Sequence, residues 1–266
     1  MILTTFFLFI LGAAVGSFLN VVLYRSIIGQ DWVRGRSRCD SCKKQIKWYD
    51  NIPLLSYFVL RGKCRHCNVQ IALAHPVVEF LTGLLFAWWY LGGSFFFQLT
   101  QAPFQALQPL FWLTVGILLV MIFVADILYL LIPDITVLLL LAITILYRMG
   151  LILAGIMQPT DLYNSLLAMV LVFLFFASLW FFTGGRGMGL GDVKLVVPLS
   201  LLLGWPNIIV GLFVAFISGA VAGVVLIVLG KRKMGQVIPF GPFLVTGTVV
   251  ALTFGDQILG WYLGFI

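Results

Sequence analysis

The sequence predicts an all-α polytopic membrane protein: about eight transmembrane helices, with a small cytoplasmic four-cysteine zinc-binding domain between the first two. Three observations lead to this prediction. The 266-residue chain is 62% hydrophobic and only 9% charged, whereas a soluble domain is typically about 25% charged. Its apolar residues are collected in runs near the ~20 residues that cross a bilayer as a helix. All four of its cysteines fall in one polar loop.

Hydropathy divides the chain into three parts. Residues 1–25 form the first span, which lacks a basic start and a small-residue cleavage site and is therefore expected to be retained rather than removed as a signal peptide. Residues 26–75 form the polar loop, and residues 76–266 form the remaining bundle. The spans are expected at about 2–24, 76–93, 107–126, 134–156, 162–183, 192–204, 207–229 and 240–264. The sixth span is short, which in membrane proteins often marks a functional site.

The 16 Lys and Arg residues predict the orientation. Ten lie in 25–65, two lie at 186 and 194, and three lie at 231–233, whereas only Arg148 lies toward the other face. With eight spans these three loops share one side, and loops rich in Lys and Arg face the cytoplasm. Loss of one span would divide the cationic loops between the two sides, so the charge pattern itself favours eight. The net charge of +7 therefore reflects topology, and no nucleic-acid partner is expected.

The polar loop carries two Cys-x-x-Cys pairs, Cys39/Cys42 and Cys64/Cys67, separated by 21 residues. This pattern is typical of a tetrahedral zinc site with four thiolate ligands, which has no open position for water and is structural. A loop this short buries too little apolar surface to fold alone, and a bound metal would supply the missing stability. Reduced free thiols and redox-active pairs are the alternatives. His66 is expected to be solvated, although it could replace a cysteine as ligand.

A glycine-rich stretch at 184–194 interrupts the apolar sequence with five glycines, an aspartate and two cations. Irregular backbone at membrane depth is tolerated only where protein covers it or where it lines a wet cavity. Gly187, Gly189 and Gly191 alternate, which permits positive φ and the close approach of another chain. An extended segment here would pair with an unwound substrate as a strand does. A plain flexible loop with helix-packing glycines is the alternative.

Only nine acidic residues are present, and two of them are expected at the same membrane depth. Asp126 ends the third span and Asp192 opens the sixth, both on the cytoplasmic side of the predicted topology. If the two helices are neighbours, the carboxylates can share one proton, because like charges at close range do not both ionise. One then acts as general base on a water and the other as general acid, which is the chemistry of an aspartyl peptidase. Spacing alone leaves open an ion or proton relay in a transporter and two separate helix caps.

Three further polar residues, in or next to the predicted spans, have two possible roles each. Asp134 is interpreted as the N-cap of the fourth span, with a position next to the Asp126–Asp192 pair as the alternative. Lys194 is either an interfacial anchor or an electrostatic influence on Asp192. Glu79, about one turn inside the second span, is costly there unless it is paired or wet. It is expected to contact the cytoplasmic loop or to belong to a second site. Within that loop, the aromatic residues 48–57 are expected to lie on the membrane surface or to pack against the bundle.

Separated motifs occur in order along the chain: Gly16-Ser17-Phe18-Leu19-Asn20-Val21-Val22 with Tyr24-Arg25, the cysteine pairs around Asn51-Ile52-Pro53, Pro76-Val77-Val78-Glu79, Asp126 with Ile132-Pro133-Asp134, Gly187-Met188-Gly189-Leu190-Gly191-Asp192-Val193-Lys194, and Ile238-Pro239-Phe240-Gly241-Pro242-Phe243. Together they resemble the type IV prepilin peptidases, intramembrane aspartyl peptidases of the GxGD kind. The likeness covers nearly the whole chain, and the set of motifs is far more specific than any one of them.

The resemblance implies an activity. Asp126 and Asp192 would be the catalytic pair, and the substrates would be prepilins and pseudopilins of type IV pili or type II secretion. Cleavage would follow a glycine on the cytoplasmic side of the substrate's apolar helix, in the bacterial inner membrane. Bifunctional members also methylate the new amino terminus with S-adenosylmethionine, and the cysteine domain is implicated in that step. Both activities are therefore expected here, with Glu79 as a candidate contact of the methyl donor; a peptidase without methyl transfer is the alternative.

Three departures from the family pattern leave the two aspartates themselves unchanged. Arg186 occupies a position that is often glutamate, and residues 127–129 are unusually apolar. Ala72-Leu73-Ala74-His75 replaces a segment of the Ser-x-Arg-Tyr type and removes a cation. The lost cation bears on binding of the methyl donor's carboxylate, and so on methyl transfer rather than on proteolysis.

Overall fold

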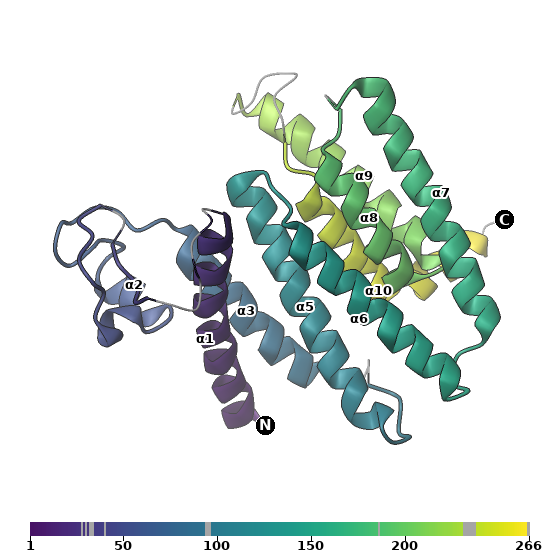
Figure 1. Cartoon of the computed structure of the whole chain (residues 1–266), viewed down its shortest axis with the longest axis horizontal. Helices are drawn as coiled ribbons and strands as arrows, with labels where there is room; N and C mark the ends of the chain where they lie inside the picture. Colours follow the sequence, from purple (N-terminus) through teal and green to yellow (C-terminus); the bar gives the residue numbers. More distant parts are fainter. Residues whose placement is uncertain are drawn as a thin grey trace. The chain divides into compact units, whose positions relative to one another are not determined.

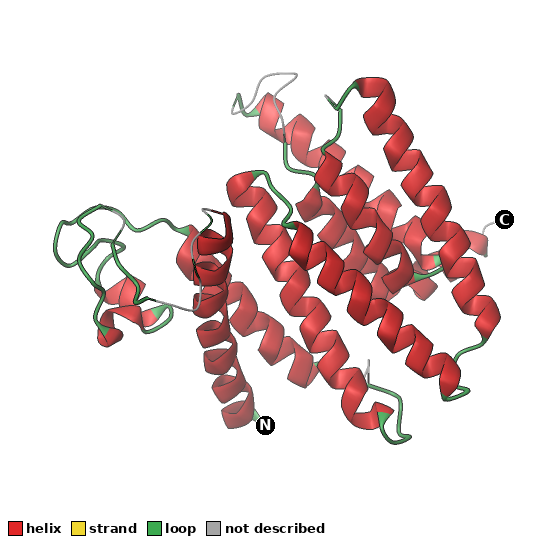
Figure 2. Ribbon diagram, in the orientation of Figure 1, coloured by secondary structure: helices red, strands yellow, loops and turns green. Residues whose placement is uncertain are grey.

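The computed structural model describes residues 1–27, 29, 31, 35–39, 41–93, 97–185, 187–230 and 238–264. Arg186 and the cations at 231–233, which entered the charge argument, lie outside these residues. Within the described ranges the chain is helical, apart from loops and two isolated bridges (Figure 1, Figure 2). The all-α prediction is confirmed. The chain divides into two compact units, Met1–Val124 and Ala125–Ile266.

The helices follow one another along the chain with short connections. The first unit contains α1 (Ile2–Ile27), η1 (Trp48–Asn51), α2 (Leu55–Val59), α3 (Ala74–Leu91) and most of α5 (Phe104–Tyr129). The second unit contains the end of α5 with α6 (Asp134–Leu153), α7 (Pro159–Thr183), α8 (Leu190–Leu203), α9 (Asn207–Val228) and α10 (Gly241–Leu263).

Close packing of α1 against α3 organises the first unit. Glycines make it possible: a Cβ at Gly12 would lie 2.6 Å from the carbonyl oxygen of Thr82, and one at Gly16 would lie 2.9 Å from Cα of Glu79. In lipid, small residues let two helix backbones approach, because van der Waals packing rather than the hydrophobic effect drives helix association. Gly12 and Gly16 are therefore packing residues, and Gly16 lets Glu79 lie beside α1.

Helix α8 is the centre of the second unit, where α6, α7, α9 and α10 all contact it (Figure 1). Ten of its 14 residues are buried. Apart from Asp192, Lys194 and Ser200 the helix is apolar, and a largely apolar helix belongs in a core. α9 and α10 pack so closely that a Cβ at Gly247 would collide with the backbone of Gly211.

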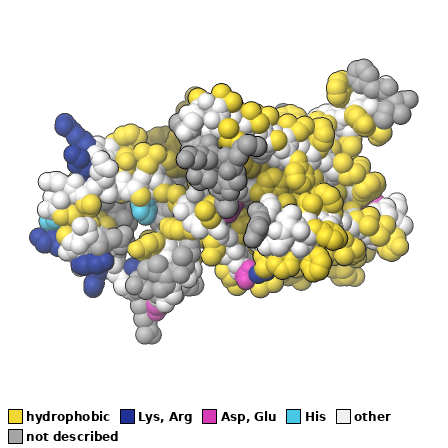
Figure 3. Space-filling view, turned by 90° about the horizontal axis from the view of Figure 1, so that it is seen from above, with side chains coloured by type: hydrophobic (Ala, Val, Ile, Leu, Met, Phe, Trp, Pro, Cys, Tyr) yellow, Lys and Arg dark blue, Asp and Glu magenta, His cyan; other side chains and the backbone are white. Residues whose placement is uncertain are grey.

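Six helices of the described chain are long and apolar enough to cross a membrane: α1, α5, α6, α7, α9 and α10. Helices α3 and α8 occupy the places of the second and sixth expected spans but are not among these six. Hydrophobic side chains cover much of the helical surface that Figure 3 shows, whereas Lys and Arg gather on the loop between α1 and α3 (Figure 3, left). The surface pattern is that of a multi-pass membrane protein with one polar segment.

Arg148, the cation that was placed toward the other face, lies beside the last turn of α8. Its Nη1 donates to Oγ of Ser165 at 2.9 Å, and its Nη2 donates to the carbonyl of Leu202 at 3.5 Å. Asp192 lies in the first turn of the same helix. Arg148 and Asp192 are therefore at opposite ends of α8.

Candidate functional site

Asp126 is buried near the C-terminal end of α5, with 6% of its surface exposed. Its Oδ2 accepts a hydrogen bond of 2.8 Å from the backbone N–H of Gly241, the first residue of α10. The first N–H groups of a helix have no partner within the helix, and the helix dipole places partial positive charge there. The start of α10 therefore holds and orients the Asp126 carboxylate.

Asp192 is the third residue of α8 and is 7% exposed. Its carboxylate faces back toward the start of its own helix, since a Cβ at Gly189 would lie 3.4 Å from Asp192 Oδ2. The carboxylates of Asp192 and Asp126 are close enough to interact electrostatically. Two buried carboxylates, one from α5 and one from α8, therefore lie in the second unit, where the charge of Asp126 acts on Asp192. A buried charge is costly unless it is compensated, and sharing one proton relieves the repulsion of such a pair.

Gly191 allows the loop after α5 to approach the start of α8. A Cβ at Gly191 would lie 3.2 Å from the side chain of Ile132, closer than ordinary van der Waals contact. A Cβ at Gly187 would lie 3.0 Å from Thr183, at the end of α7. Close approach is therefore a reason for glycine at both positions, and at Gly191 it fixes the chain next to Asp192.

The alternating glycines 187, 189 and 191 were also expected to permit a positive φ, but in the structure other glycines of the stretch adopt it. Gly184 and Gly185 have φ of 58° and 75°, whereas Gly187, Gly189 and Gly191 are not among the positive-φ residues. The left-handed conformation is needed where α7 ends, because Gly184 is its C-cap. Gly189 has φ −75° and ψ 146°, which is extended backbone directly before α8.

The interpretation of Asp134 as an N-cap is wrong. Pro133 is the N-cap of α6, and no side chain caps that helix. Asp134 Oδ1 instead accepts from Nζ of Lys194 at 2.8 Å. The two side chains are 66% and 50% exposed. Lys194 therefore links α8 to α6 two residues after Asp192, and the alternative position for Asp134, near the aspartate pair, describes it better.

Sequence reasoning noted the motif around Gly241 but missed its contact with Asp126. Phe240, the N-cap of α10, packs against Phe216 of α9 with 5.2 Å between ring centroids. Phe176 of α7 is fully buried and adds a third ring at 6.5 Å from Phe240. Aromatic pairs at such distances stabilise packing beyond the area that they bury. The start of α10 is thus held by rings from two other helices, and Pro242 was the available signal for a helix start.

The four cysteines form a second candidate site, in the first unit. Their Sγ atoms all lie within 4.8 Å of one another, and Cys39 and Cys67 are 3.8 Å apart. A tetrahedral zinc with Zn–S bonds of about 2.3 Å would separate its sulfurs by about 3.8 Å. The geometry therefore fits a single tetrahedral metal ion with four thiolate ligands.

The two cysteine pairs have the same local fold. In each, the first cysteine donates its N–H to a residue five positions on, Cys39 to Lys44 at 3.0 Å and Cys64 to Val69 at 2.9 Å. A residue with positive φ precedes each acceptor, and an isolated β-bridge flanks each turn. Hydrogen bonds from the backbone of Cys67, and then of His66, lower the pKa of the Cys64 thiol to about 6. The Cys67 thiol shifts the other way: against a lowering hydrogen bond from the Val69 backbone, burial and the neighbouring sulfurs raise its pKa to about 11. A lowered thiol pKa favours the thiolate, which is the form that binds metal.

Glu79 connects the cysteine loop to the helices, as one of its two expected roles predicted. It is 9% exposed, and its Oε2 accepts a 2.7 Å hydrogen bond from the backbone N–H of Leu54. Asn20 Nδ2 donates to the carbonyl of His75 at 3.2 Å nearby. Both buried side chains are engaged by backbone groups, so they do not by themselves identify where a methyl donor would bind.

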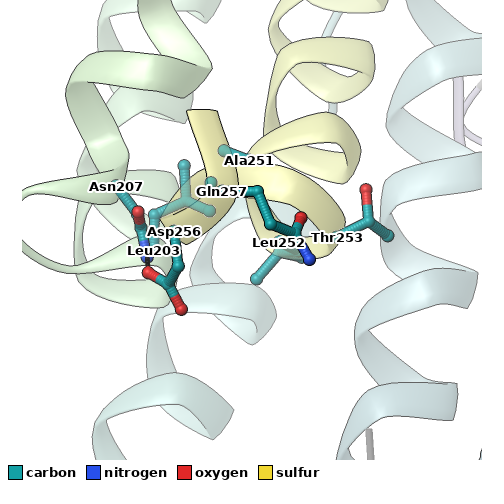
Figure 4. A pocket seen from close by; sticks show the side chains of 8 residues that line it. Leu203, Asn207, Ala251, Leu252, Thr253, Asp256 and Gln257 are labelled. Atoms are coloured by element: carbon teal, nitrogen blue, oxygen red, sulfur yellow. Dashed lines mark hydrogen bonds between the residues drawn. The ribbon is translucent and has the colours of Figure 1, made fainter. Parts of the chain in front are cut away.

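A cavity of about 110 Å³ lies at the other end of the second unit, between α8, α9 and α10 (Figure 4). Asn207 Nδ2 donates to Asp256 Oδ1 at 3.0 Å, while the buried Asn207 Oδ1 has no partner among the described residues. Leu203, at the end of α8, also lines it. Ligand pockets are typically 300–1,000 Å³, and this cavity is far from Asp192. It is not a candidate for a peptide site.

Comparison with known proteins agrees with the motifs. Residues 10–92 match the bacterial peptidase A24 N-terminal domain, and residues 112–224 match the type IV leader peptidase family. A prepilin leader peptidase/N-methyltransferase of Stutzerimonas stutzeri is 35% identical over 96% of this chain and 92% of that protein. Proteins of the same name from Pseudomonas aeruginosa and Bacillus subtilis are 34% and 29% identical, each over 96% of this chain and over 92% and 96% of their own. No solved structure matches the chain. The chain therefore belongs to the type IV leader peptidase family.

Proposed function

We propose that this peptidase cleaves the leader of type IV prepilins and pseudopilins with Asp126 and Asp192. The observation that carries the proposal is the pair of buried carboxylates, brought within electrostatic range from α5 and α8. The bond from Gly241 to one of them supports it further.

The chemistry is hydrolysis of one peptide bond. One carboxylate takes a proton from a water, whose oxygen forms a bond to the carbonyl carbon of the substrate. The carboxylic acid of the other aspartate supplies the proton that the departing amine needs, and the C–N bond breaks. The pair ends with one proton between its two carboxyl groups, as it began. General acid–base catalysis of this kind typically contributes 10²–10⁴-fold.

The test is the cleavage of a prepilin by Asp126→Asn and Asp192→Asn variants, followed by mass spectrometry of the substrate. Each variant keeps the shape of the side chain and loses the acid–base group, so we expect a loss of at least ~10²-fold. Asp161→Asn and Asp256→Asn are matched controls, because these carboxylates lie toward the end of the second unit that holds Arg148 and Asn207. Normal processing by either of the first two variants would exclude the assignment.

Gly187, Gly189 and Gly191 are proposed to receive the substrate. A peptide bond within a helix is shielded and must unwind before attack. The extended backbone of Gly189 lies next to Asp192 and offers main-chain groups that an unwound segment can pair with, as a strand pairs with a sheet edge. Lys194 and Asp134, exposed at the same end, then border the path of the substrate.

Methyl transfer to the new amino terminus, with S-adenosylmethionine as donor, is proposed from the relatives' shared name, prepilin leader peptidase/N-methyltransferase. A peptidase without methyl transfer is the second candidate, favoured by the missing cation in residues 72–75. Glu79 remains the candidate contact, and one of its oxygens already binds the Leu54 N–H. The mass of the mature substrate distinguishes the two, because methylation adds one methyl group to its N-terminus.

We also propose that zinc is the ion held by Cys39, Cys42, Cys64 and Cys67, with a structural role. With four thiolates bound, zinc supplies a fixed cross-link between the two halves of the loop and has no open position for water. The spacing of the sulfurs supports this choice.

The proposed topology has eight spans, with α3 and α8 crossing the bacterial inner membrane beside the six longer helices. The cysteine loop and the two aspartates would then face the cytoplasm. The distribution of Lys and Arg supports this orientation. So does the separation of Arg148 from Asp192 along α8.

A further inference from the structure

The cysteine loop carries a short helix whose apolar side faces outward. In α2, Leu55, Phe58 and Val59 are 56%, 73% and 66% exposed. Their spacing of three and four residues places them on one helix face. The opposite side faces the loop itself: Ser56 Oγ bonds to the carbonyl of Ile52, and the ring of Tyr57 lies over Gly62. The helix therefore turns its apolar face outward, where a soluble domain would have a polar face. Exposed apolar patches of this kind mark interaction sites.

One hydrogen bond fixes the depth of this face. Leu54, the residue before α2, donates its N–H to the buried Glu79 at 2.7 Å. Glu79 is the sixth residue of α3, about 7.5 Å inside that helix at 1.5 Å per residue. Gly16, which faces Glu79 Cα, precedes the end of α1 by 11 residues or about 16 Å. Helix α2 thus lies beside the α1–α3 pair rather than beyond its end (Figure 1).

The loop that carries this face is strongly positive. Residues 26–75 contain nine Lys and Arg against three Asp. Asp50 forms an ion pair with Arg65 at 2.6 Å. Five further cations are exposed: Lys43, Lys44, Lys47, Arg61 and Lys63. Trp48, 80% exposed, adds an aromatic side chain of the kind enriched at membrane interfaces. Basic residues next to an apolar helix face are the combination that binds anionic lipid surfaces.

We propose that the face formed by Leu55, Phe58 and Val59 inserts into the lipid on the side of the membrane where the cysteine loop lies, with the surrounding cations on anionic lipid headgroups. The partner is the bilayer that α1 itself crosses, so the surface is within reach at the depth that Glu79 imposes. Interfacial helices bury their apolar faces about 5–10 Å into the headgroup and acyl boundary, which agrees with the position of Leu54 along α3. The loop is then fixed by four attachments: its two chain ends, the Glu79 bond and the lipid contact.

The test places the photoreactive amino acid p-benzoylphenylalanine at Phe58 in the full chain, reconstituted in nanodiscs with and without phosphatidylglycerol. After irradiation, mass spectrometry identifies what is attached to residue 58. We expect a phospholipid adduct at least ~5-fold above that at Tyr57, the matched position whose ring faces Gly62, and a higher yield with the anionic lipid.

A cross-link from residue 58 to another segment of this chain, or equal lipid adducts at 58 and 57, would overturn the proposal. Equal yields in neutral and anionic nanodiscs would overturn the role of the cations. The same residue at Leu55 gives a second reading of the face if the Phe58 variant does not fold, and it should also attach to lipid.

Discussion

The backbone N–H of Gly241 bonds to Oδ2 of Asp126, two groups 115 residues apart in the chain. A Cβ at residue 241 would lie 2.7 Å from that same oxygen. Only glycine therefore lets α10 start against the carboxylate. The position of one proposed catalytic oxygen depends on the absence of a side chain on a different helix.

Gly241→Ala should lower prepilin cleavage by about 10²-fold, because a displacement near 1 Å in an active site can cost that much. Gly260→Ala is the control in the same helix, since a Cβ there would meet no atom within 4 Å. The measurement is the initial rate of cleavage in reconstituted membranes. Equal rates for Gly241→Ala and the unmodified chain would contradict the positioning role.

Asp134→Asn should reduce cleavage far less than Asp192→Asn, by no more than about tenfold. Its pair with Lys194 is exposed at both ends, and exposed ion pairs typically contribute only 0–1 kcal/mol. A double-mutant cycle with Lys194→Met should give a coupling within that range, smaller at high salt. A loss as large as that of Asp192→Asn would assign Asp134 to the chemistry instead.

Purified protein should contain about one zinc per chain, measured by elemental analysis. Cys39→Ser should lose the metal, because three thiolates cannot complete the site, whereas His66→Ala should keep it. His66 is exposed and is not part of the cysteine cluster. Retention by the Cys39 variant together with loss in the His66 variant would show that histidine is the ligand.

Glu79→Ala should loosen the attachment of the cysteine loop. It leaves the Leu54 N–H without its acceptor, and an unsatisfied buried group costs about 1–3 kcal/mol. Amide hydrogen exchange at Leu54 should therefore become faster, by about 10-fold or more. Glu79→Gln keeps a carbonyl oxygen and should remain closer to the unmodified chain. Unchanged exchange in the alanine variant would contradict the contact.

Much of the fold was predictable because its signals are local. Each apolar run became a helix, and the spacing of the cysteines already indicated a single cluster. Asp126 and Asp192 stood out because a carboxylate is costly in apolar sequence, and the structure buries both side chains. These inferences need only hydropathy and spacing, which a sequence records directly.

What the sequence could not indicate were contacts between distant helices. Asp134 follows a proline before a helix, which is the usual place for a capping carboxylate. Its oxygen instead accepts a hydrogen bond from Lys194 of α8. Within the glycine-rich stretch the left-handed residues are Gly184 and Gly185, because α7 ends there and the chain must turn. Gly241 belongs to a motif that was noticed, yet its contact with Asp126 depends on how α10 packs, which no local pattern records.

The length of α8 has a consequence for the supply of water. Its 14 residues rise about 21 Å, about 9 Å less than a hydrocarbon core of ~30 Å. In the eight-span topology, contacts with four other helices bury ten of the 14 residues of α8, so thinning of the bilayer around it would relieve little of this hydrophobic mismatch. We therefore expect a water-filled recess at one end of the helix to make up the difference. If that recess lies at the first turn, water reaches Asp192 from the membrane surface. The rest of the bilayer then remains impermeable to it.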